Sequence, residues 1–183
     1  KVLEEKQIVE LFEKESMPDT DRFSFKPIHK KVIFNDDQDR VVGNLKDSLE
    51  KKSYTPFLLH GVTGSGKTEI YIEAVNYCLS QGRTSIILLP EISLTPQIAG
   101  RFKSVFGATI ALWHSKLTQK QRSLTWKEIC KGTFKVIIGA RSAIFSPLKN
   151  LGLIVIDEEQ EASFRQDSPS PRYHARDVAL MRA

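Results

Sequence analysis

Short apolar runs alternate with amphipathic stretches along most of this chain. The runs are rich in Val, Ile, Leu and Phe, which is typical of buried strands, and they cover residues 57–60, 85–89, 109–113, 135–139 and 152–156. Between them, apolar residues return at helical spacing and predict helices over residues 68–81, 95–106 and 117–131. Strands that alternate with helices favour an α/β fold of three layers, in which helices cover both faces of a mostly parallel sheet.

Two helix ends carry clear signals. Asn35 is a suitable N-cap, since two aspartates follow it and apolar residues then recur with helical spacing. Gly82 stands directly after the 68–81 stretch, where a glycine that ends a helix belongs. These signals place a further helix before the first predicted strand and fix the end of the next helix.

The N-terminal part has a different pattern. Residues 2–15 are amphipathic, but a breaker-rich stretch follows them, so we interpret residues 1–34 as a linker or the edge of a preceding domain. Residues 35–183 are then one domain, large enough for a sizeable core. With 40% hydrophobic and 27% charged residues, the composition is that of an ordinary globular protein.

The sequence also argues against several classes of protein. No apolar run approaches the length of about 18 residues that a transmembrane helix needs, and the first residues lack the apolar core of a signal peptide. We therefore expect a cytoplasmic protein without a membrane partner. Cys78 and Cys130 lack the spacing of metal ligands, so we expect reduced cysteines and no zinc site within this chain.

Positive charge concentrates between Trp113 and Lys135. This window has a net charge of +5, equal to the excess of the whole chain, and it also contains Trp126 and Phe134. One interpretation is a solvated helix face with a tryptophan in the core. The other is a surface that contacts a nucleic-acid backbone. The pattern alone leaves both open.

Residues 61–68 form the most informative motif, because they match G-x-x-x-x-G-K-[ST] at every fixed position. An apolar run precedes the motif and a predicted helix follows it, which is the context of a phosphate-binding loop. Backbone N–H groups of such a loop surround an anion, Lys67 supplies a cation to the phosphates, and Thr68 offers a hydroxyl to Mg²⁺. The predicted nucleotide-binding residues are Gly61, Val62, Thr63, Gly64, Ser65, Gly66, Lys67 and Thr68.

A second motif turns nucleotide binding into hydrolysis. The run Leu-Ile-Val-Ile predicts a strand buried on both faces, and Asp157 and Glu158 follow directly. Ligands of open α/β sheets bind at the carboxyl ends of strands. Asp157 is therefore the candidate ligand of Mg²⁺, and Glu158 the candidate group that orients or deprotonates the attacking water. With Lys67 they form the candidate catalytic set.

The two motifs, together with segments 90–97, 138–145 and 171–177, resemble the first RecA-like lobe of superfamily 2 helicases. More narrowly, the chain is similar to the replication-restart helicases of the primosomal protein N′ family. Segment 90–97 resembles the helicase motif Ia, which contacts a DNA backbone, and segment 138–145 stands where motif Ib belongs. The resemblance covers about residues 35–183 and implies a RecA-like phosphate-loop NTPase fold.

The resemblance implies ATP and Mg²⁺ as cofactors, and single-stranded or forked DNA as a partner. It also implies other domains of the same polypeptide and possible contacts with primosome proteins. Gln38 corresponds to the glutamine that reads adenine, since its amide can bond both N6 and N7. The implied DNA contacts are Thr95, Gln97, His114, Arg141 and Ser142. A loop implied to couple DNA binding to hydrolysis contains Phe164, Arg172, Tyr173 and His174.

Gln160 departs from the family, which usually has His there, and segment 168–171 is less aromatic than expected. The second RecA-like lobe and the family's zinc-binding cysteines are expected beyond residue 183. We therefore expect this chain alone to have little motor activity. Two rivals stay open: a double-strand DNA translocase lobe of the restriction-enzyme type, and a nucleotide-gated DNA-binding module without turnover.

Overall fold

The computed structural model describes residues 32–51, 53–62 and 64–183. Its centre is a sheet of four parallel strands in the order β2-β3-β1-β4. The strands are β1 (Thr84–Leu88), β2 (Ile110–Trp113), β3 (Val136–Gly139) and β4 (Leu151–Ile156). Each matches a predicted run. Because the strands are parallel, their carboxyl ends all lie at one edge of the sheet.

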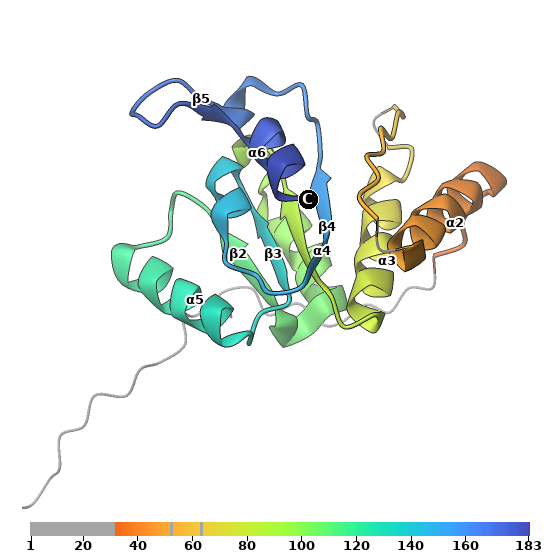
Figure 1. Cartoon of the computed structure of the whole chain (residues 1–183), viewed down its shortest axis with the longest axis horizontal. Helices are drawn as coiled ribbons and strands as arrows, with labels where there is room; N and C mark the ends of the chain where they lie inside the picture. Colours follow the sequence, from red (N-terminus) through yellow and green to blue (C-terminus); the bar gives the residue numbers. More distant parts are fainter. Residues whose placement is uncertain (1–31, 52, 63) are drawn as a thin grey trace, which may run out of the picture.

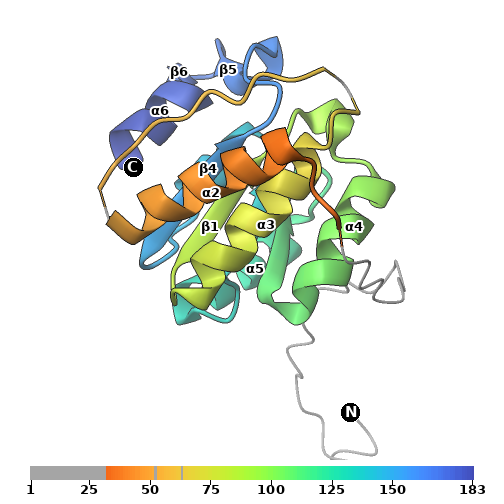
Figure 2. The ribbon, with the colours of Figure 1, turned by 90° about the vertical axis from the view of Figure 1, so that its right-hand side faces the viewer.

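Alternation along the strands produces the three predicted layers (Figures 1 and 2). In β1, Ile86 and Leu88 face one hydrophobic cluster, while Ile87 and the following Leu89 face another. The first cluster is covered by α5 (Gln119–Lys131) and α6 (Ala175–Arg182), the second by α3 (Lys67–Ser80) and α4 (Pro96–Phe106). All five strand residues of β1 are buried, as expected for an interior strand of a parallel sheet.

Local signals set the helix ends close to the predicted positions. Thr95 caps α4 by accepting a hydrogen bond from the Ile98 backbone N–H at 3.4 Å, and Thr118 forms a capping box at the start of α5. Gly82, which follows α3, has a φ of 70°. Helix α2 (Asp36–Lys51) lies outside α3 and contacts it through an ion pair of 2.7 Å between Lys46 and Glu73. The predicted helix over residues 2–15 lies outside the described residues.

The predicted strand over residues 57–60 is wrong. This stretch joins no strand of the sheet; it runs as an extended segment outside it, with Phe57 49% and Leu58 84% exposed (Figure 2). The apolar run is only three residues long, and Pro56 before it has no N–H to donate to a ladder. The segment therefore offers few ladder bonds, and β4 is left at the edge of the described sheet, half-exposed along its length.

Short 3₁₀ helices lie near the strand ends: two follow β1 and β3 at the carboxyl edge, one precedes β2 at the opposite edge, and one follows β4. The 3₁₀ helices are η2 (Glu91–Ser93), η3 (Gly107–Thr109), η4 (Arg141–Phe145) and η5 (Ala162–Phe164). After η5, β5 (Arg165–Gln166) and β6 (Tyr173–His174) form an antiparallel hairpin that leads into α6. Among the described residues, no helix combines the length and apolar character needed to cross a bilayer.

Candidate nucleotide site and strand-end surface

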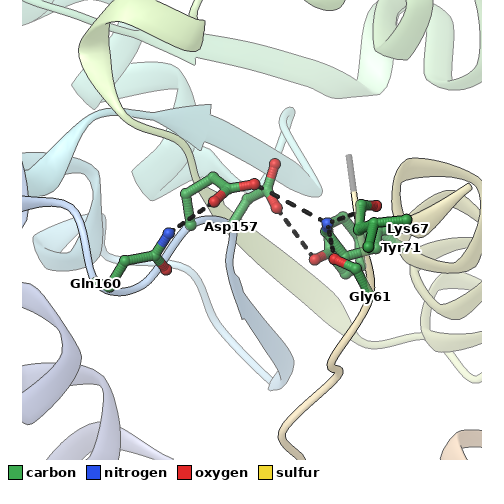
Figure 3. A network of polar contacts seen from close by, with 7 residues as sticks. Gly61, Lys67, Tyr71, Asp157 and Gln160 are labelled. Carbon is green, nitrogen blue, oxygen red and sulfur yellow. Dashed lines mark hydrogen bonds and ion pairs between the residues drawn. The ribbon is translucent and has the colours of Figure 1, made fainter. Parts of the chain in front are cut away.

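The phosphate-binding loop ends where helix α3 begins, as its sequence predicts. Gly66 is the N-cap and Lys67 the first helical residue. The Lys67 ammonium donates to the backbone carbonyls of Gly61 at 2.7 Å and Val62 at 3.3 Å, and its side chain is only 17% exposed (Figure 3). The cation is thus held inside the curve of its own loop, beside the positive end of α3. Thr63, also predicted to bind nucleotide, lies outside the described residues.

Gly66 meets two separate requirements for glycine. Its φ is 85°, a backbone conformation that residues with a side chain rarely adopt. In addition, a Cβ there would lie 2.5 Å from Nε2 of Gln38. Gln38 approaches this closely because Nε2 donates to the carbonyl of Ser65 at 2.9 Å. Its Oε1 meanwhile accepts from the backbone N–H of Asn35 at 3.0 Å, which closes a capping box at the start of α2. Helix α2 is therefore attached directly to the phosphate-binding loop.

Asp157 lies at the carboxyl end of β4, as predicted. Its N–H continues the ladder by donating to the carbonyl of Leu88 at 3.0 Å, which fixes its backbone beside β1. The Tyr71 hydroxyl on α3 donates to Asp157 Oδ1 at 3.1 Å (Figure 3). Burial raises the pKa of Asp157, although the Tyr71 hydrogen bond acts in the opposite direction. Thr68 and Asp157 line the same small pocket, together with Tyr71.

Glu158 has an unusual backbone. Its φ of 49° is positive, which a non-glycine residue rarely adopts and which stores strain where it occurs. One carboxylate oxygen lies 4.0 Å from the Lys67 ammonium, and the other accepts a hydrogen bond of 2.8 Å from Gln160 (Figure 3). The turn therefore aims Glu158 at the mouth of the phosphate-binding loop, between a cation and an amide.

The donors in this pocket fit Mg²⁺. A threonine hydroxyl and an aspartate carboxylate are oxygen ligands, which Mg²⁺ prefers, and two protein ligands are typical where phosphates and waters supply the rest. Within the part of the chain that the structure describes, no three His, Cys, Asp or Glu side chains gather into a metal site. With two protein ligands, Thr68 and Asp157 are suited to a metal that arrives with a nucleotide, which supplies the remaining ligands together with water.

The five predicted DNA contacts all come after strand ends at the carboxyl edge of the sheet. Gln97 and Ser142 are exposed, and the Ser142 hydroxyl accepts a hydrogen bond of 3.1 Å from the Trp113 indole at the end of β2. Thr95 is partly committed to capping α4. His114 is half-buried, and burial, followed by the charge of Lys116, lowers its pKa. A neutral imidazole offers a hydrogen bond to a phosphate but no charge.

The fifth, Arg141, has contacts that the sequence does not predict. It donates to the backbone carbonyl of Arg165 in β5, and its guanidinium carbon lies 5.7 Å from the centroid of the Tyr173 ring. Tyr173 is half-buried, and Arg172 before it is exposed. The two arginine contacts join the end of β3 to the hairpin.

The implied coupling loop contains one residue that the structure does not place on the surface. Phe164 is 1% exposed and belongs to the core cluster with Ala175 and Ala179. Its ring is therefore not available to stack on a base while the fold is intact. His174 caps α6 by accepting a hydrogen bond of 3.2 Å from the backbone N–H of Arg176. Of Phe164 and Tyr173, Tyr173 is the one whose ring lies close to the surface.

Sequence reasoning missed Tyr71. It lies four residues after Lys67 on α3, one helical turn along, so helical geometry places it on the same side as the lysine. That spacing was the available signal. What the sequence lacked was the position of β4 relative to α3, which brings the tyrosine hydroxyl to Asp157.

Comparison with known proteins identifies the class. A model of the DEAD/DEAH box helicase family matches residues 35–179. The chain belongs to this family, and its parallel sheet with helices on both faces is the RecA-like α/β fold expected of such a domain. Membership of this family implies the use of a nucleotide.

Individual relatives narrow the similarity. The chain is 47% identical over 148 residues to Replication restart protein PriA of Bacillus subtilis (strain 168), covering 81% of the chain and 18% of that protein. It is 44% identical over 146 residues to the protein of that name from Chlamydia pneumoniae, covering 80% and 20%. Over 135 residues it is 48% identical to the Synechocystis protein, covering 74% and 16%. The chain thus spans at most a fifth of these relatives, and the predicted resemblance to replication-restart helicases is confirmed.

Proposed function

We propose that residues 35–183 are the ATP-binding lobe of an ATP-dependent DNA helicase that acts in replication restart. The observation that carries the proposal is the meeting of two distant motifs: Lys67 lies 4.0 Å from Glu158, and Thr68 shares a pocket with Asp157. The similarity to proteins named Replication restart protein PriA supports the biological setting. A motor that works on chromosomal DNA acts in the cytoplasm of a bacterial cell, which is the location we infer.

In this proposal the ATP phosphates occupy the curve of the loop. Lys67 exchanges the carbonyls of Gly61 and Val62 for phosphate oxygens, and the N–H groups at the start of α3 bond the same anion. Thr68 and Asp157 would hold Mg²⁺, which would neutralise phosphate charge. Gln38 exchanges at least one of its present partners, Asn35 or Ser65, for the adenine edge.

Hydrolysis depends on Glu158. Its carboxylate accepts a proton from the attacking water or orients that water in line with the γ-phosphate. The hydrogen bond from Gln160 and the charge of Lys67 keep the carboxylate facing the loop. In related phosphate-loop enzymes an arginine finger adds about 10³–10⁵ in rate. We propose that a second lobe of the whole protein supplies this arginine. The lobe described here therefore hydrolyses ATP slowly when it is alone.

Single-stranded DNA would cross the carboxyl edge of the sheet, over the exposed Gln97 and Ser142 and beside His114 and Thr95. This edge is where open α/β sheets bind ligands. The neighbouring helix α5 carries much of the basic window identified in the sequence, including Lys120 and Arg122, and adds a favourable potential for a polyanion.

The experiment that tests the proposal is ATP turnover by the full-length protein, with and without single-stranded DNA. Lys67→Ala should lower turnover by at least about 100-fold, comparable to the loss of one key electrostatic group in other enzymes. Lys46→Ala is the matched control, because it removes a lysine from the outer surface pair with Glu73. Retained DNA-stimulated turnover in Lys67→Ala would refute the assignment of the loop.

A further inference from the structure

Arg141 lies where the strand-end surface meets the β5–β6 hairpin, and its recorded contacts are with the hairpin. Its Nη1 donates to the carbonyl of Arg165, and its guanidinium lies 5.7 Å from the Tyr173 ring centroid. Its Nε is buried and has no hydrogen-bond partner among the described atoms. A phosphate would have to displace the carbonyl to take Nη1, and it has no open path to Nε. Two of the three guanidinium nitrogens of Arg141 are therefore unavailable to a DNA backbone.

The segment that carries Arg141 also contacts the strand-end surface. Ser142 accepts a hydrogen bond from the Trp113 indole at the end of β2. At the other end of η4, the ring of Phe145 packs edge-on against Tyr173, with ring centroids 5.0 Å apart. The five residues of η4 thus lie between the surface proposed to bind DNA and the hairpin.

The hairpin is in turn attached on both sides to the acidic motif. On one side, β5 follows η5, whose Phe164 is buried in the core. On the other side, β6 leads into α6, where Arg176 pairs with Glu159 at 3.2 Å. Glu159 is the neighbour of Glu158, whose backbone has the positive φ described above. The hairpin is therefore linked to the turn that holds Glu158 through the chain on one side and through an ion pair on the other.

We propose that Arg141 is a positioning residue that clamps the hairpin onto η4 and thereby couples DNA at the strand-end surface to the orientation of Glu158. The inference rests on the proposed function. It replaces the direct phosphate contact that the sequence predicts for Arg141. The clamp has two parts, a hydrogen bond to a backbone carbonyl and the attraction of a cation to an aromatic face.

The test is Arg141→Ala in the full-length protein, with ATP turnover measured with and without saturating single-stranded DNA. The clamp predicts that the basal rate and the DNA affinity stay within about twofold, while stimulation by DNA falls about tenfold, or 1.4 kcal/mol. A phosphate contact predicts the opposite. Affinity would then fall for all sequences, the log–log salt slope would decrease by about 0.7, and saturating DNA would restore full stimulation. That result overturns the clamp.

Arg182→Ala is the matched control, because the described hydrogen bonds of the Arg182 side chain go to the carbonyls of Ile144 and Ser146 and none goes to the hairpin. It should lower the melting temperature and keep stimulation; equal loss of stimulation would mean that loosening η4 in any way suffices, which overturns the specific role of Arg141.

If Arg141→Ala does not fold, the pair Tyr173→Phe and Tyr173→Leu decides. The phenylalanine keeps the aromatic face and should keep stimulation, whereas the leucine should lose it; equal stimulation in both overturns the clamp. Absence of DNA-stimulated turnover in the unaltered protein would refute the proposed function, and the clamp with it.

Discussion

Replacing Gly66 with alanine should damage the phosphate-binding loop in two separable ways. The φ of 85° imposes a left-handed conformation on an L-residue, which costs about 1–2 kcal/mol. The new Cβ would also lie 2.5 Å from Nε2 of Gln38, so the Gln38 side chain must leave. Its hydrogen bond to Ser65 is then lost, at about 1 kcal/mol. The sum is about 2–3 kcal/mol of unfolding free energy.

Gly64 provides the matched control within the same loop. Its φ of 81° is nearly identical, but a Cβ there would meet nothing within 4 Å. Gly64→Ala should therefore cost only the conformational part, about 1–2 kcal/mol. Urea denaturation measures both variants, and an unchanged m-value shows that the difference is one of stability alone.

A double-mutant cycle isolates the second part. In a Gln38→Ala background there is no amide to displace, so Gly66→Ala should cost no more than Gly64→Ala does. When Gln38 is retained, Gly66→Ala should also weaken ATP binding, because the new side chain disturbs the approach of α2 to the loop. If Gly64→Ala and Gly66→Ala cost the same in both backgrounds, the contact between Gln38 and the loop has no energetic role.

Three further predictions follow from the site and the core. Asp157→Asn should weaken Mg²⁺-dependent nucleotide binding, whereas Glu158→Gln should keep binding and stop hydrolysis, since an amide cannot take a proton from water; equal loss of binding in both contradicts the separate roles. Phe164→Ala should lower the unfolding free energy by about 3–5 kcal/mol, because the ring is fully buried, and a chemical denaturation curve like that of the parent would contradict its place in the core. The pKa of His114 is lowered in the folded protein, so its imidazole takes up a proton at a higher pH in the unfolded chain than in the folded one. The free energy of unfolding therefore falls as the pH drops below the ordinary pKa of 6.5. His114→Gln should lose less stability than the parent between about pH 7 and pH 5.5, and identical pH profiles would contradict this.

The sheet and the main helices could be predicted because their signals are local. β3 is a continuous apolar run and β1 ends in one. Thr95, Gly82 and Asn35 mark helix ends through hydrogen bonds or dihedral angles set within a few residues. The predicted strand over residues 57–60 was wrong because its local signal is weak. Its apolar run is short and follows Pro56, and whether such a stretch joins the sheet depends also on a partner edge that no local signal reveals.

In the candidate site, too, the features with a local sequence signal could be predicted and the contacts between distant residues could not. The positions of Lys67, Thr68 and Asp157 could be predicted, because their motifs stand at the start of a helix and at the carboxyl end of a strand. The contacts of Tyr71 with Asp157 and of Arg141 with Tyr173 join residues far apart in the chain, and no sequence period reveals them. The position of Phe164 in the core is of the same kind, since an aromatic after the acidic motif suits a surface loop and a core equally well.

The half-exposed outer side of β4 has a consequence for handling this domain in solution. An unpaired row of N–H and C=O groups beside apolar side chains is a template for strands of other molecules. The exposed Phe57 and Leu58 lie in a stretch of extended backbone, the shape that such pairing needs. Concentrated samples should therefore self-associate through intermolecular strand addition, and a lysine placed at Leu58 should act as a gatekeeper that keeps the domain monomeric.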